Sequence, residues 1–125
     1  MAETRYTKSH EWARLEDGVV TIGVTQHAVD ELKDLTFLDY RVEADESIKQ
    51  GDVFGEIDAV KATSELFAPV SGTVLALNEA LEDGSELGVL STSPEGEGWL
   101  IKLRPDDASE LEQLFTAAEY AAHCE

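Results

Sequence analysis

Lys61 is the residue of this sequence whose type and position could do chemistry. It is one of five lysines, and it stands between two strand-like segments, residues 53–60 and 62–68. A tight hairpin between these segments would place the lysine amine at its tip, exposed to solvent and open to acylation. A lysine in a turn is more often an ordinary solubilising side chain. The position of Lys61 alone does not decide between these two interpretations.

The other reactive residue types form no recognisable site in the sequence. His10, His27 and His123 are scattered, without a cysteine or carboxylate partner at the spacing of metal ligands. Cys124 is the one cysteine, so neither an intramolecular disulfide nor a thiol cluster can form. The sequence contains no nucleophile elbow and no glycine-rich phosphate loop. We therefore expect no metal site and no catalysis by the chain itself.

The composition limits the fold and the partners. The chain has 125 residues, 42% of them hydrophobic, which is enough for one domain over residues 1–125 with a packed core. Its 27 acidic and 9 basic residues give a formal net charge of −18, so binding to nucleic acid or to a membrane surface is not expected. No secretory signal and no apolar run of about 20 residues are found. We expect a monomer in the cytoplasm, or in an organellar matrix if a transit peptide has been removed.

The elements that must position Lys61 are mostly short strands. Turns with glycine or proline separate them, and their connections are mostly too short for parallel crossovers, so antiparallel pairing is predicted. Thr25 is placed to cap a short helix that ends near Asp34, and Phe37 is expected in the core. The predicted strands cover residues 19–24, 35–42, 53–60, 62–68, 73–77 and 99–103.

The last fifteen to twenty residues are predicted to form a helix. Asp107 and Glu110 have the spacing of a capping box. The apolar residues behind them fall on one face of a helix that runs close to the end. These are Leu111, Leu114, Phe115, Ala118 and Ala122. The predicted fold is therefore mainly β: a small antiparallel β sandwich or flattened barrel with a short internal helix and a C-terminal helix.

The segment around Lys61 resembles the lipoyl-attachment hairpin of the glycine cleavage system H proteins. It reads Glu56-Ile-Asp-Ala-Val-Lys61-Ala-Thr-Ser-Glu65-Leu-Phe-Ala-Pro69-Val-Ser-Gly72. The family has Glu-Ser-Val-Lys-Ala there, followed by an acid, an apolar pair and Pro-Val-Ser-Gly. Further matches in the same order cover nearly the whole chain: Tyr6-Thr-Lys-Ser-His-Glu-Trp12, Gly23-Val-Thr-Gln-His-Ala28, Gly96-Glu-Gly-Trp99 and the tail helix with Tyr120.

This resemblance implies a non-catalytic carrier with the hammerhead fold of lipoyl and biotinyl carriers, and lipoate bound covalently to Lys61. Biotin carriers normally place their lysine between two methionines, whereas Val60 and Ala62 flank it here. A lipoate ligase or lipoyltransferase would attach the group. The arm would then take an aminomethyl group from glycine decarboxylase to the aminomethyltransferase, and dihydrolipoyl dehydrogenase would reoxidise it.

The resemblance also implies a cleft that shields the loaded arm from water. The matching positions are Ser9, Glu11, His27 and Glu65. A carboxylate in such a cleft would stabilise a cationic amine through a charge-assisted hydrogen bond. Each of these residues also has an ordinary structural interpretation: Glu11 could simply be exposed, and His27 could cap or pack against its helix.

Departures from the family pattern lie in loops and at the rim of this cleft. Asp58-Ala59 replaces Glu-Ser, Glu65 replaces aspartate, and residues 40–44 and 84–93 differ in sequence and length. These departures leave open a second interpretation, an H-like lipoate-binding protein that carries sulfur intermediates in bacterial sulfur oxidation with a heterodisulfide-reductase-like complex. A third is an acidic adaptor whose lysine stays unmodified.

Overall fold

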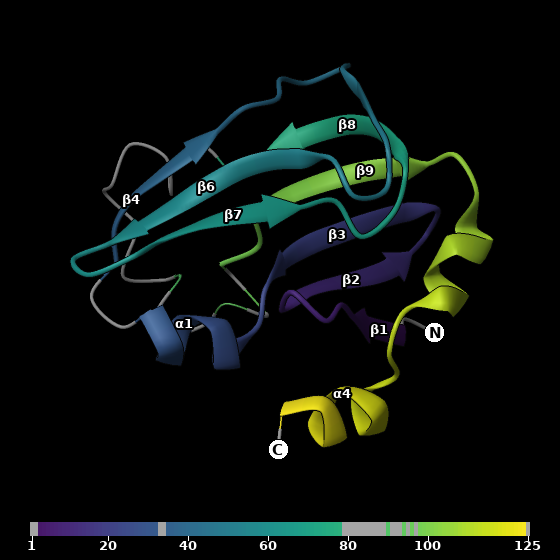
Figure 1. Cartoon of the computed structure of the whole chain (residues 1–125). Helices are drawn as coiled ribbons and strands as arrows, with labels where there is room; N and C mark the ends of the chain where they lie inside the picture. The colour runs from purple at the N-terminus through teal and green to yellow at the C-terminus, as the bar shows by residue number, and fades with distance from the viewer. Residues whose placement is uncertain are drawn as a thin grey trace.

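Two antiparallel sheets form the fold (Figure 1). The computed structural model describes residues 3–32, 35–78, 90, 94, 96 and 98–124. The larger sheet has the strand order β1-β2-β3-β9-β8-β5 and the smaller one β4-β6-β7. The strands are β1 (Glu3–Tyr6), β2 (Glu11–Glu16), β3 (Val19–Val24), β4 (Leu35–Tyr40), β5 (Ser47–Ile48), β6 (Val53–Ala59), β7 (Thr63–Phe67), β8 (Gly72–Leu77) and β9 (Ile101–Pro105).

The core lies between these two layers. Ile22 of β3 pairs with Ile101 of β9, and neither side chain is exposed. Leu38 of β4 and Ile57 of β6 enter the same buried cluster from the smaller sheet. Alternation along each strand directs one set of side chains inward. Neither sheet closes on itself, so the predicted mainly β fold is confirmed in its sandwich form.

A buried tyrosine hydroxyl links the two layers. Tyr40 ends β4 in the smaller sheet, and its hydroxyl is shared between the carbonyls of Leu100, at 2.9 Å, and Asn78, at 3.0 Å. Asn78 directly follows β8 and Leu100 directly precedes β9, and these two strands belong to the larger sheet. Because a buried hydroxyl needs a partner, this contact fixes how the sheets lie against each other.

Phe37 corrects the predicted core. Its side chain is 45% exposed, whereas the sequence pattern predicts it in the core. The pairing of β4 with β6 shifts between Leu35 and Phe37, and beyond this irregularity Leu38 and Tyr40 are the residues that point inward. A strand side chain changes faces when the register moves by one residue, so Phe37 lies on the outer face.

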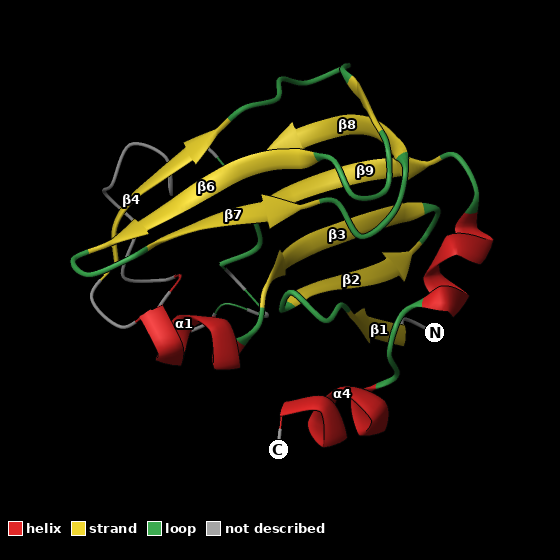
Figure 2. Ribbon diagram, viewed as in Figure 1, coloured by secondary structure: helices red, strands yellow, loops and turns green. Residues whose placement is uncertain are grey.

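The tail is two short helices, so the prediction of one continuous helix is wrong (Figure 2). A 3-10 helix, η1 (Ala108–Gln113), is followed by α4 (Ala117–Cys124). Between them the Phe115 N–H donates to the Tyr6 carbonyl at 2.8 Å, and the Tyr6 N–H donates back at 2.9 Å. This pairing holds Phe115 in an extended conformation, which a helix cannot contain.

At the start of η1, one of the two residues of the predicted capping box has its expected role and the other does not. Asp107 accepts a hydrogen bond from the Ser109 N–H at 3.0 Å, as a capping residue should. The Glu110 carboxylate instead accepts from the Ser71 N–H at 2.7 Å. It therefore ties the tail to the turn before β8.

Most of the predicted strands are confirmed, with small shifts at their ends. The last one, β9, begins two residues later than predicted. The strands β1, β2 and β5 are not among the predictions, because Glu3–Tyr6 and Glu11–Glu16 are rich in charged residues. Thr25 caps α1 (Gln26–Leu32) as expected, by accepting from the Ala28 N–H at 3.2 Å. The predicted end of that helix at Asp34 lies outside the described residues.

None of the helices in the described part of the chain has the length and apolar character needed to cross a bilayer.

Candidate functional site

Lys61 lies at the tip of the hairpin that joins β6 and β7, where the sequence predicts it. The Ala59 N–H donates a hydrogen bond to the Ala62 carbonyl at 2.8 Å, and Val60 and Lys61 are the two residues between them. The hairpin extends beyond the rest of the fold at this end (Figure 1). The two paired strands therefore determine where the lysine backbone lies.

The lysine amine is available to another molecule. Lys61 is exposed, and within the described ranges it forms no ion pair or hydrogen bond. Its neighbour Val60 is also exposed, at 66%, which offers an enzyme an apolar contact beside the amine. Just behind the tip, the Thr63 hydroxyl donates to the Asp58 carboxylate at 3.1 Å and links the two strands. The tip thus combines a base held by strand pairing with an exposed side chain that carries an amine.

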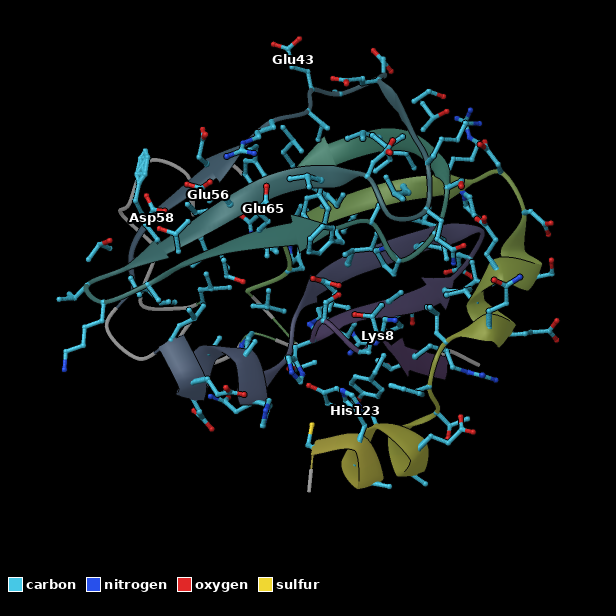
Figure 3. The ribbon with its side chains drawn as sticks, viewed as in Figure 1. Lys8, Glu43, Glu56, Asp58, Glu65 and His123 are labelled. Carbon is cyan, nitrogen blue, oxygen red and sulfur yellow. The ribbon has the colours of Figure 1, made fainter. Side chains whose placement is uncertain are left out.

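The hairpin carries acidic side chains behind the lysine (Figure 3). Glu56 and Glu65 are cross-strand partners, and Arg41 approaches both, at 2.5 Å from Glu56 and 3.6 Å from Glu65. A hydrogen bond with Asp58 raises the pKa of Glu56, with burial a weaker cause in the same direction. The three carboxylates therefore make this side of the hairpin acidic, with Arg41 beside two of them.

A cavity of about 410 Å³ opens where the hairpin meets the larger sheet. The end of β7 and the loop after it form one wall, with Phe67 and Pro69. The loop between β1 and β2 forms another wall with Ser9, together with Glu11, the first residue of β2. The structure therefore brings two of the four predicted cleft residues together.

Glu11 is a buried carboxylate with three hydrogen-bond donors. Only 1% of Glu11 is exposed, so the alternative that it is an exposed surface residue is wrong. One carboxylate oxygen accepts from the hydroxyls of Thr7 and Ser9, both at 2.7 Å, and the other accepts from the Phe67 N–H at 3.3 Å. Burial raises the pKa of Glu11, although the hydrogen bonds act in the opposite direction. Thr7, which supplies the second hydroxyl in this arrangement, is not among the predicted cleft residues.

This raised pKa predicts how Glu11 affects stability with pH. Between the ordinary pKa of 4.5 and the higher folded value, the folded protein binds more protons than the unfolded chain. The contribution of Glu11 to stability is therefore complete below 4.5 and is lost as the pH rises through the folded pKa. We expect the stability of the wild type minus that of Glu11→Gln to fall between pH 4 and pH 7 in urea unfolding.

Glu112→Gln, at an exposed position of η1, is the matched control for that measurement. A wild-type advantage over Glu11→Gln that grows with pH would contradict the prediction, because it would show that the folded state favours the ionised carboxylate.

The other two predicted cleft residues do not line this cavity. Glu65 points to Arg41 on the acidic surface of the hairpin. His27 lies in the first turn of α1, where its Nε2 is 2.5 Å from the Glu31 carboxylate. The centre of its ring is 4.5 Å from that of His10. Ser9 and Glu11 therefore form one group, apart from His27 and Glu65.

The structure brings two of the histidines close to the cysteine, although they are not at metal-ligand spacing in the sequence. His10, His27 and Cys124 each offer a ligand atom, and these atoms all lie within 4.8 Å of one another. The bridge between Tyr6 and Phe115 returns the tail to the start of the chain, and α4 then reaches the histidines. Linear spacing gave no signal of this proximity, because Cys124 is more than a hundred residues from His10.

The open two-sheet β fold and the exposed lysine at its hairpin tip are what a carrier of a covalently bound prosthetic group requires. The glycine cleavage H-protein family profile matches residues 4–125. The chain belongs to this family, whose members are the lipoyl carriers of the glycine cleavage system.

Individual relatives agree with this assignment. A glycine cleavage system H protein of a Cyanothece species is 47% identical over 123 residues, which are 98% of this chain and 93% of that protein. One of Saccharophagus degradans is 44% identical and covers 99% of this chain and 94% of its own. The crystal structure of a glycine cleavage system H protein from Mycobacterium marinum superposes with a TM-score of 0.86 at 35% identity, covering 96% and 94% of the two chains.

Proposed function

We propose that this protein carries a lipoyl group as an amide on the Nζ atom of Lys61. The observation that supports this most directly is the exposed amine, without an ion pair in the described structure, at the tip of a rigid hairpin. A lipoate ligase or lipoyltransferase must reach this amine, and the exposed Val60 beside it adds apolar contact. The protein supplies presentation, and the chemistry belongs to the prosthetic group.

The residues present fit such a group. Lipoate, once bound, would supply a redox-active pair of sulfur atoms that carry the chemistry. Lys61 tethers it and so keeps it at a high local concentration near each docked enzyme. At the other end of β7, Ser9 and Glu11 line a cavity in which the buried carboxylate can hold a cationic amino group. We assign the cleft role to these two residues, and not to His27 or Glu65.

In this function the chain is a carrier subunit and not an enzyme. It takes an aminomethyl group from glycine decarboxylase, presents it to the aminomethyltransferase and returns to the oxidised form through dihydrolipoyl dehydrogenase. The acidic face of the hairpin and the net charge of −18 favour encounter with basic docking surfaces on these partners.

Loading by glycine decarboxylase tests the proposed cargo. The lipoylated full chain is mixed with the decarboxylase and ¹⁴C-labelled glycine, and the release of labelled carbon dioxide is followed. We expect release that depends on the lipoylated chain, while the unlipoylated chain gives none. A lipoylated chain that the decarboxylase cannot load would contradict the aminomethyl cargo and would favour a sulfur-carrying function.

A further inference from the structure

His10, His27 and Cys124 form a cluster that the proposed carrier function does not use. One imidazole nitrogen from each histidine and the cysteine Sγ lie within 4.8 Å of one another. All three residues are partly buried. His10 precedes β2, His27 lies in α1, and Cys124 ends α4. Three separate elements therefore deliver metal-ligating atoms to one place, and we call these three residues the His-Cys cluster.

We propose that the His-Cys cluster binds a thiophilic divalent cation, Zn²⁺ being the ion whose preferences it matches. Imidazole nitrogen and thiolate sulfur are both zinc ligands, and three protein ligands leave a fourth position for water or another donor. Zn–N and Zn–S bonds of about 2.1 and 2.3 Å require ligand atoms roughly 3.3–3.6 Å apart. Cys124 lies in the last turn of the C-terminal helix α4, and the proposed binding includes a small movement of the side chains that brings the ligand atoms, now within 4.8 Å of one another, to that separation.

Hydrogen bonds already orient both imidazoles. Nδ1 of His10 lies 2.7 Å from the Tyr120 hydroxyl, which in turn lies 2.7 Å from the Thr25 hydroxyl. Nε2 of His27 contacts the Glu31 carboxylate at 2.5 Å. These contacts leave Nε2 of His10 and Nδ1 of His27 for the metal. A histidine that ligates a metal usually makes such a contact through its other nitrogen, so this arrangement is that of a supported site.

The three elements that carry the cluster are far apart in the sequence. A metal bound here would join α4 to β2 and α1.

Cobalt(II) titration provides the test, because a cobalt–thiolate bond has a charge-transfer band in the near ultraviolet. The full chain carries Lys61→Arg, so that lipoyl sulfur cannot contribute, and is kept reduced in an oxygen-free, thiol-free buffer. We expect one cobalt ion per chain, the sulfur band, and displacement of cobalt by Zn²⁺. Cys124→Ser should lose the band, and His27→Ala should weaken binding about tenfold or more.

His123→Gln is the matched control. His123 lies next to Cys124 on α4, and its ring centre is 5.9 Å from that of His10, but it is not in the His-Cys cluster. This variant should keep the band and the affinity. The proposal is overturned if the parent chain shows no sulfur band, if Cys124→Ser binds cobalt as tightly as the parent does, or if binding is weak, multiple and insensitive to all three substitutions, as expected for the acidic surface alone. Circular dichroism in EDTA verifies that each variant is folded.

Discussion

Lys61→Arg will abolish the addition of a lipoyl group and leave the protein folded. The arginine keeps the positive charge at the hairpin tip, but its guanidinium is not a nucleophile that a lipoate ligase can acylate. Intact-mass spectrometry after co-expression with a lipoate ligase should show the mass of one lipoyl group on the wild-type chain and none on the variant.

Lys49→Arg is the matched control, because the Lys49 side chain is 74% exposed and its one ion pair among the described residues is with Asp106, at 4.0 Å. It should be modified as the wild type is. A Lys61→Arg chain that still gains the mass would show that the group is attached elsewhere. The melting temperature of Lys61→Ala should barely change, since exposed turn residues usually contribute within about 0.5 kcal/mol. A large loss there would instead make Lys61 a structural residue.

The largest effect on stability is expected from Trp12→Ala, at about 3–5 kcal/mol. Trp12 has no exposed surface, and its indole N–H donates to the Pro94 carbonyl at 3.0 Å. Its ring lies against Gly23, where a Cβ atom would be only 2.7 Å from the indole nitrogen. The substitution therefore creates a large cavity and leaves a buried carbonyl without its donor. Urea unfolding followed by circular dichroism measures the loss without depending on tryptophan fluorescence.

Trp99→Ala is the comparison for Trp12→Ala, since the chain has only these two tryptophans. Trp99 is half-buried, with the Lys102 ammonium 4.7 Å from its ring centre. Its truncation should cost clearly less, because solvent already reaches part of the ring. Equal losses at the two positions would show that burial does not set the contribution of these rings.

The hairpin was predictable because its information is local. Val53, Phe54 and Ile57 mark β6, the apolar pair Leu66 and Phe67 marks β7, and the turn between them is short. These signals need only neighbouring residues. The same holds for the Thr25 cap, whose partner is three residues away.

The rest depends on contacts between distant parts of the chain. The Tyr6–Phe115 bridge interrupts the predicted tail helix, and the residues around Phe115 do not predict this bridge. The same return of the tail places Cys124 beside His10 and His27. Burial of Glu11 likewise depends on Phe67, which is 56 positions away. Tertiary pairing overrides local preference in each case.

The unbroken pairing from Glu56–Glu65 to Asp58–Thr63 also sets the direction in which the lysine points. Because side chains alternate along a strand, lengthening both arms by one residue would turn the amine to the opposite side of the ribbon and raise it by about 3 Å. Lengthening both by two would restore its original direction at roughly 7 Å greater height. This series of insertions changes the direction of the amine and its height above the fold separately. It therefore shows which of the two determines whether an acylating enzyme modifies the lysine.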